Sequence, residues 1–169
     1  MRKSLFSALS LVILVGVLAP NGIDAFDRDR VAGSYAGNAE LTSAAPPGAI
    51  TVFPALFVIH ADKTYLFRGP NLVQGLSVGV WRKGNTPRQI RGQLEQFEFG
   101  FGPDTLVSRK LFTTFVQTFD KDFNTFTGEA IITFFDCFVE VTAIVCGGPP
   151  DIPSETLFFN ISGTRISAN

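Results

Sequence analysis

The sequence predicts an all-β protein in which one antiparallel meander closes into a barrel of about eight strands, and three observations support this. Segments rich in Phe, Val, Ile and Thr recur about every 8 to 14 residues, with turn-forming residues between them. No long stretch combines the apolar spacing of an amphipathic helix with freedom from Gly, Pro and β-branched runs. In some segments polar residues occur among the alternate positions that form the apolar face of the strand. A barrel accommodates such residues better than a two-layer sandwich does. The sandwich is the alternative fold.

Runs of β-branched and aromatic residues bounded by turn residues mark the expected strands. They cover residues 31–41, 49–60, 64–68, 76–83, 89–99, 106–119, 125–135, 138–145 and 155–167. Several connections are short and polar or contain Gly and Pro, at residues 61–63, 83–87, 100–104 and 120–124. Short connections join antiparallel neighbours, so the sheet should meander. Irregular structure is expected at residues 42–48 and 147–154.

Three of these strands carry further information. Pro54 removes one backbone donor from its strand and indicates a bulge or an edge position there. In residues 106–119, Arg109, Thr113 and Gln117 share a parity with apolar residues, which suits a barrel with some polar groups inside or at its mouth. In residues 125–135 one parity is apolar or small and should face the core: Phe126, Gly128, Ala130, Ile132 and Phe134.

The N-terminal 25 residues are predicted to be a secretory signal peptide. Arg2 and Lys3 precede an apolar run over residues 5–19, and Ala25 is the expected cleavage position. The run has about 15 residues, whereas a membrane-spanning helix needs roughly 20, so an anchor is the alternative reading. Residues 26–169 are therefore expected to form a single secreted or periplasmic barrel domain with no membrane span.

Composition narrows the classes of function. The chain is 46% hydrophobic and 17% charged with 18 phenylalanines, which excludes an intrinsically disordered protein. A formal net charge of -1 without a basic patch makes nucleic acid an improbable partner. A closed barrel has no free sheet edges, so nothing in the sequence requires oligomerisation or specifies an oligomeric state.

Cys137 and Cys146 are the only cysteines, and an oxidising compartment would favour a disulfide between them. The segment between them contains no Gly, Pro or Asn and is expected to be one strand, residues 138–145. Such a strand would hold the sulfurs about 30 Å apart, whereas a disulfide needs Cα atoms within about 7 Å. The chain must therefore reverse between the cysteines if they pair. Two buried free thiols are the alternative.

Catalytic motifs are scarce. One His and two Cys are too few for a metal site of three or four convergent ligands, so neither a metal nor a cofactor is expected. His60 is expected to be a rim residue, and no serine can be tied to it by sequence as the nucleophile of a catalytic triad. Glu95 and Glu98 lie in a strongly apolar strand and are the candidate catalytic groups. They have opposite parities, so at most one points inward, and the alternative is that both face solvent.

An aromatic barrel interior could enclose a small apolar or amphipathic molecule. Tyr65, Trp81, Arg91 and Phe115 are the expected ligand contacts, although Trp81 could be a core residue and Arg91 an exposed one. A ligand site should have a cavity above about 300 Å³. The first alternative is an isomerase or cyclase with an inward carboxylate, although an enzyme is the less favoured class. The second is an envelope or interaction protein with a filled interior and an apolar surface patch.

Five short segments occur in an order that resembles small secreted bacterial barrel proteins of the calycin-like and allene-oxide-cyclase-like groups. They are residues 53–64, 79–83, 97–99, 126–130 and 163–166. The resemblance covers roughly residues 31–166 and implies a barrel, without an activity that could be carried over. Lys63 stands where the pattern expects Gly, and residues 137–150 are longer than the pattern. Lipocalin-like barrels place Trp in an early Gly-x-Trp and an Arg across it, whereas this chain has Tyr35 at that position.

Overall fold

The computed structural model describes residues 28–45, 47–69, 76–99, 107–140, 143–149 and 151–167, and the predicted signal peptide lies outside them. Within these residues a short helix, α1 (Arg28–Val31), precedes nine strands. The strands are β1 (Gly33–Leu41), β2 (Val52–Ile59), β3 (Thr64–Arg68), β4 (Ser77–Lys83), β5 (Gln89–Phe99), β6 (Val107–Phe119), β7 (Thr125–Glu140), β8 (Ala143–Cys146) and β9 (Glu155–Arg165).

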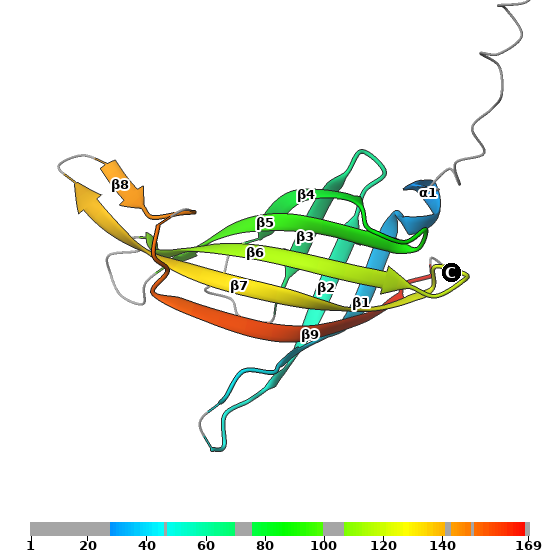
Figure 1. Cartoon of the computed structure of the whole chain (residues 1–169), viewed down its shortest axis with the longest axis horizontal. Helices are drawn as coiled ribbons and strands as arrows, with labels where there is room; N and C mark the ends of the chain where they lie inside the picture. Colours follow the sequence, from blue (N-terminus) through cyan, green and yellow to red (C-terminus); the bar gives the residue numbers. More distant parts are fainter. Residues whose placement is uncertain are drawn as a thin grey trace, which may run out of the picture.

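Eight of the strands form a closed antiparallel barrel (Figure 1). Consecutive strands pair from β1 to β7, and β9 pairs with both β7 and β1, which completes the ring. The predicted barrel is confirmed and the sandwich alternative is wrong. No helix in the described part of the chain is long and apolar enough to cross a bilayer.

Side chains point alternately into and out of the barrel, because a strand has a period of two residues. On β6 and β7 the interior pairs Leu111 with Phe134 and Phe115 with Ala130. Gly92 on β5 lies opposite Phe115, and a Cβ there would stand 2.6 Å from Phe115 Cζ. The absence of a side chain at Gly92 therefore leaves room for the Phe115 ring inside the barrel.

The expected strand boundaries agree with the structure to within a few residues, with one exception. The strand predicted over residues 138–145 is wrong, because the chain leaves the barrel at the end of β7 and returns as β8. Two local predictions are confirmed. Among the described residues Pro54 pairs with β1 alone, because the pairing of β2 with β3 begins at Leu56, so Pro54 has an edge position there. Lys63 has a φ of 75°, a conformation that Gly adopts more easily.

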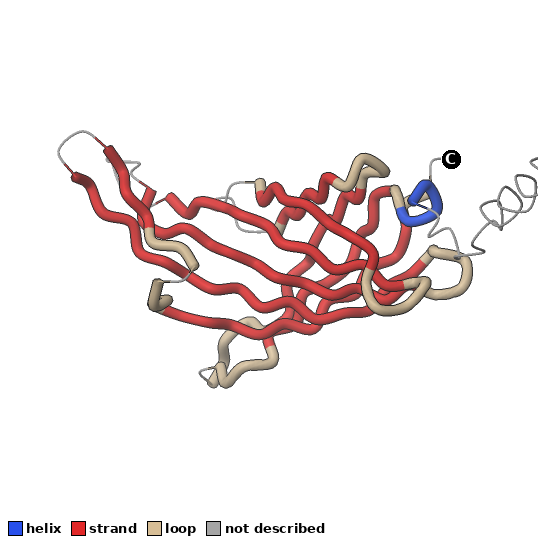
Figure 2. Tube along the Cα trace, turned by 45° about the horizontal axis from the view of Figure 1, so that its top comes forward, coloured by secondary structure: helices blue, strands red, loops and turns tan. Residues whose placement is uncertain are grey.

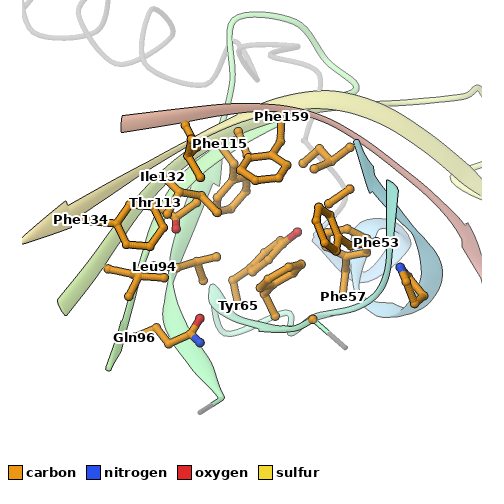
Figure 3. A pocket seen from close by; sticks show the side chains of 18 residues that line it. Phe53, Phe57, Tyr65, Leu94, Gln96, Thr113, Phe115, Ile132, Phe134 and Phe159 are labelled. Atoms are coloured by element: carbon orange, nitrogen blue, oxygen red, sulfur yellow. The ribbon is translucent and has the colours of Figure 1, made fainter. Parts of the chain in front are cut away.

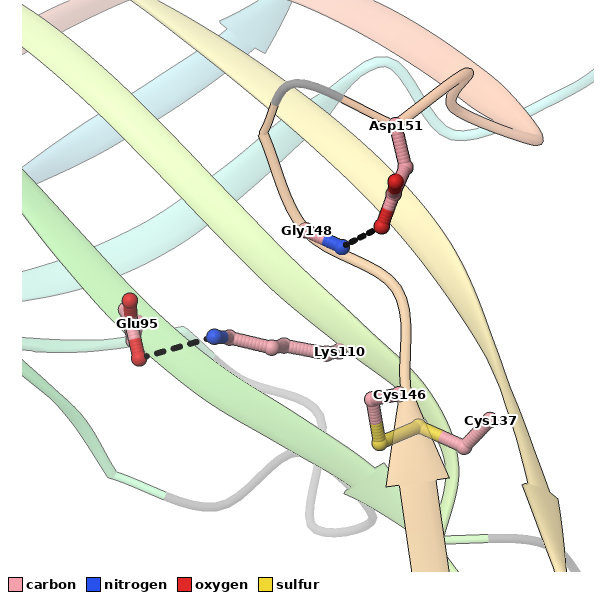
Figure 4. The surroundings of a disulfide bond; sticks show 6 residues. All are labelled: Glu95, Lys110, Cys137, Cys146, Gly148 and Asp151. Carbon is pink, nitrogen blue, oxygen red and sulfur yellow. Dashed lines mark hydrogen bonds and ion pairs between the residues drawn. A yellow bond between two sulfur atoms is a disulfide. The ribbon is translucent and has the colours of Figure 1, made fainter.

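The disulfide between Cys137 and Cys146 is present and joins β7 to β8 directly opposite each other (Figure 4). Both strands of this hairpin project beyond the barrel, at the end opposite α1 (Figure 2). After β8 the chain turns back through Gly148, whose N–H donates to Asp151 Oδ2 at 3.0 Å, and enters β9. The disulfide therefore closes a hairpin that lies outside the barrel ring.

The α1 end of the barrel is closed by a compact cluster around Arg165 and Tyr35. Arg165 Nε and Nη1 donate to the carbonyls of Phe123 and Ala32 at 3.0 and 3.1 Å, and Nη2 donates to the Tyr35 hydroxyl at 2.6 Å and to the Arg30 carbonyl. The Arg165 guanidinium also lies 5.1 Å from the centroid of the Tyr35 ring. This arrangement ties α1, the β6–β7 turn, β1 and β9 together. We call the end of the barrel that contains α1, Tyr35 and Arg165 the closed end.

Candidate ligand-binding cavity

The other half of the barrel contains a cavity of about 210 Å³. This volume is below the 300 Å³ or so expected of a drug-sized site, but above the roughly 150 Å³ that holds benzene in an engineered core. Figure 3 shows labelled side chains from several strands surrounding the space. Six phenylalanines provide much of its wall: Phe53, Phe57, Phe67, Phe115, Phe134 and Phe159.

The cavity exists because small residues line this half of the barrel, whereas large residues fill the closed end. Ala39 on β1 and Ala130 on β7 both face the interior and are 7% exposed. At the closed end the corresponding positions on these strands are Tyr35 and Phe126, whose rings pack edge-on with centroids 5.5 Å apart. The same two strands therefore fill one half of the barrel and leave the other half partly empty.

Two polar side chains face the cavity from its wall nearer the mouth. The mouth is the end at which β5 and β7 finish and β6 and β9 begin. Gln96 on β5 is 7% exposed, and its Oε1 accepts a hydrogen bond from the hydroxyl of Ser77 on β4. Thr113 on β6 is half-buried at a similar level. Both side chains belong to the inward parity of their strands.

A second polar pair lies at the floor of the cavity. Tyr65 on β3 is 1% exposed and packs its ring against Phe115, with centroids 4.3 Å apart. Gln117 on β6 is fully buried, and its Nε2 donates to the Tyr65 hydroxyl at 2.6 Å. Burial raises the pKa of Tyr65 well above its ordinary value, although the hydrogen bond from Gln117 opposes the shift. The Tyr65 hydroxyl is therefore neutral at physiological pH.

Charged side chains gather at the mouth, above the cavity. Arg109 on β6 donates from Nε to Glu98 Oε2 at 2.7 Å and from Nη1 to Glu155 Oε2 at 3.3 Å. Its guanidinium lies 4.5 Å from the centroid of the Phe134 ring. The hydrogen bond to Glu98 is the largest cause of a raised pKa for Arg109. The guanidinium of this mouth cluster (Glu98, Arg109 and Glu155) is thus shared by two carboxylates.

The structure places the sequence-predicted ligand contacts in different environments. Tyr65 and Phe115 line the cavity. Trp81 is 3% exposed and donates from Nε1 to the His60 carbonyl at 2.9 Å, so it packs beside the β2–β3 turn and not against the cavity. Arg91 is exposed on the outer face, because Ile90 next to it takes the inward parity of β5. Trp81 and Arg91 therefore lie outside the lining of this cavity, and their role as ligand contacts stays a prediction.

The two candidate catalytic carboxylates also separate by parity, and neither lines the cavity. Glu95 points outward from β5 and pairs with Lys110 Nζ at 3.1 Å (Figure 4). Glu98 takes the inward parity but lies at the mouth, where Arg109 holds it. Among the described residues that line the cavity none is charged. The described part of the chain also contains no cluster of three or more potential metal ligands.

Sequence reasoning missed several residues of the cavity, and one of them had a usable signal. Gln96 shares its parity with Ile90 and Leu94, both of which are buried, so a polar residue among inward positions could have been noticed. The alanines Ala39 and Ala130 carried no such signal, because a small residue can mark either close packing or empty space.

The fold and this site define a closed antiparallel β-barrel with an apolar interior cavity. Comparisons with protein-family models, with curated proteins and with solved structures find no match to this chain.

Proposed function

We propose that this chain is a secreted or periplasmic binding protein that holds a small apolar molecule inside its barrel. The observation that carries the proposal is the cavity of about 210 Å³ with aromatic and aliphatic walls. Apolar atoms placed in this space would remove its apolar walls from water and contact them, which favours binding. Uncharged lining residues favour an apolar occupant.

Export is supported by two features of different kinds. The structure has a disulfide between Cys137 and Cys146. Disulfides form readily in oxidising compartments and are uncommon in the cytosol. The sequence of residues 1–25 predicts a signal peptide. Together they favour a secreted or periplasmic location.

A calycin-like relationship is supported by the geometry of the closed end. Lipocalin-like barrels place Trp in an early Gly-x-Trp with an Arg across it, and here Gly33-x-Tyr35 on β1 faces Arg165 on β9. Tyr35 takes the position of the tryptophan and contacts the arginine through both its ring and its hydroxyl. We therefore propose that the chain is a calycin-like barrel in which tyrosine replaces that tryptophan.

Binding is tested with ethylbenzene, whose eight carbon atoms suit a cavity about 1.4 times as large as the one that holds benzene. NMR chemical-shift titration of the wild-type chain should give saturable shifts at residues around the cavity. In Ala39→Leu, the larger side chain enters the cavity and should remove this binding.

The matched control is Ala36→Leu, which makes the same change on the exposed face of the same strand. This variant should bind ethylbenzene as the wild type does. An absence of saturable binding in the wild type, or equal binding by Ala39→Leu, contradicts the proposal.

A further inference from the structure

The floor of the cavity offers one hydrogen-bond donor. Tyr65 Oη accepts from Gln117 Nε2, so the hydroxyl's own hydrogen takes no part in that bond. Among the described residues the Tyr65 hydroxyl forms no other hydrogen bond. Because a buried donor without an acceptor costs about 1–3 kcal/mol, a ligand that accepts this hydrogen would gain affinity.

The position of Tyr65 makes this donor available to a ligand. The residue lines the cavity, and Figure 3 shows its hydroxyl oxygen directed into the space between the labelled aromatic rings. Gln117 lies outside the lining, so it fixes the hydroxyl without contacting the space itself.

The electrostatic surroundings exclude a charged ligand. None of the described lining residues is charged, so an enclosed carboxylate or ammonium would lose its hydration without gaining a counter-charge. Arg109 is the inward-facing cation at the mouth, and it is already bonded to Glu98 and Glu155. A ligand carboxylate would have to compete with both.

We propose that the cavity selects neutral molecules of about eight carbon atoms over charged ones, and that it accommodates one hydrogen-bond acceptor, such as the oxygen of a ketone or an ester. The acceptor oxygen binds the Tyr65 hydroxyl at the floor, and the apolar part of the molecule lies among the phenylalanines toward the mouth. This inference rests on the proposed function and adds the chemical class and orientation of the ligand.

Three probes, each with eight carbon atoms, test the chemical class of the ligand. Ethylbenzene has no polar group, acetophenone adds a carbonyl, and phenylacetate carries a carboxylate. The wild-type chain should bind ethylbenzene and acetophenone with Kd values within about threefold of each other, because the new hydrogen bond offsets the desolvation of the carbonyl. Phenylacetate should bind at least about tenfold more weakly.

Two variants test the donor. Tyr65→Phe and Gln117→Met both abolish the hydrogen bond between these side chains, but only the first deletes the hydroxyl. Tyr65→Phe should weaken acetophenone binding about tenfold relative to ethylbenzene. Gln117→Met should change the affinities for both probes by the same factor. Circular dichroism and thermal melting of both variants report whether each still folds.

The outcomes separate the inference from the proposed function. If acetophenone binds the wild type more than about tenfold more weakly than ethylbenzene, or phenylacetate binds as tightly as acetophenone, the ligand class is wrong while the binding function stands. Equal acetophenone selectivity in Tyr65→Phe and Gln117→Met overturns the role of Tyr65. If none of the three probes binds, the proposed function fails and the inference fails with it.

Discussion

The two ends of the barrel each hold an inward-facing arginine next to an aromatic ring, but the arginines have different partners. At the closed end Arg165 bonds three backbone carbonyls and the Tyr35 hydroxyl. At the mouth Arg109 bonds the carboxylates of Glu98 and Glu155. Side-chain exposure is 34% for Arg109 and 47% for Glu155, so water and salt reach this pair.

The comparison indicates that the two ends of the barrel have different roles. Backbone carbonyls have fixed positions, so an arginine that bonds several of them locks separate segments together. Exposed ion pairs contribute little to stability, because solvent screens them and their side chains lose conformational entropy. The closed end should therefore contribute more to stability than the mouth does. Variants at the two ends, and the response to pH and salt, test this difference in role, beginning with the largest expected effect.

Arg165→Met should lower the free energy of unfolding by about 3 kcal/mol or more. The change removes the guanidinium donor from the carbonyls of Arg30, Ala32 and Phe123, leaves Phe123 only its bond from the Tyr35 hydroxyl at 3.2 Å, and removes the bond to Tyr35. Urea denaturation followed by circular dichroism measures the loss. The control is Arg82→Met on the exposed outer face, which should change stability by no more than about 0.5 kcal/mol. Equal effects of the two variants would refute the special role of the closed end.

The double variant Cys137→Ser, Cys146→Ser should lose about 2.5 kcal/mol at most, since the disulfide closes a short loop. The loop lies in the β7–β8 hairpin outside the barrel, so ethylbenzene affinity should stay within about twofold of the wild-type value. Denaturation and NMR titration on the same sample measure both quantities. A loss of ligand binding together with intact barrel structure would show that the hairpin contributes to the site.

High pH should destabilise the protein through its two tyrosines, Tyr35 and Tyr65. Burial raises the pKa of both in the folded state above the ordinary tyrosine value of about 10. Below about pH 10 both residues are neutral in the folded and unfolded states, so these groups leave stability unchanged with pH. Above pH 10 they ionise first in the unfolded state, so stability should fall by up to about 1.4 kcal/mol per pH unit for each tyrosine.

Unfolding measured from pH 9 to pH 11.5 tests the sign of this dependence. Tyr65→Phe should reduce the slope by about half. A slope that is the same in Tyr65→Phe and the wild type would contradict the assigned burial of Tyr65.

Arg109→Met should have the smallest effect, a loss of about 1 kcal/mol or less, because its ion pairs are partly exposed. The difference from the wild type should shrink further between about 0.05 and 0.5 M NaCl, as salt screens the mouth cluster. The effect of Arg165→Met should be much less sensitive to salt, since its partners are neutral. Denaturation curves at both salt concentrations compare the two arginines, and equal salt dependence would contradict the proposed difference.

The sequence anticipated most of the fold through local patterns. Short turns and β-branched runs placed the strands, and the apolar parity of residues 126–134 identified the interior face of β7. The polar interruptions at Thr113 and Gln117 correctly indicated a barrel interior. The single strand predicted over residues 138–145 was wrong, because the chain reverses between Glu140 and Ala143, where local composition contains no turn signal.

The site was only partly accessible to the same reasoning. Parity states whether a side chain points inward, but it does not state the level at which it lies along the barrel axis. Trp81 and Tyr65 are both buried, yet only Tyr65 reaches the cavity. The pairing of Arg109 with Glu98 and Glu155 joins strands far apart in the chain, so it depends on the register of the closed sheet.

The sequence by itself thus determined the class of fold and the antiparallel order, because these depend on residue period and turn length, whereas the pairing of Cys137 with Cys146 depended on a chain reversal that the sequence did not predict. The tertiary structure alone decided where the barrel is full and where it is hollow. Closure brings side chains from distant strands to one level, and whether they meet as Tyr35 and Phe126 or as Ala39 and Ala130 is a property of the assembled ring.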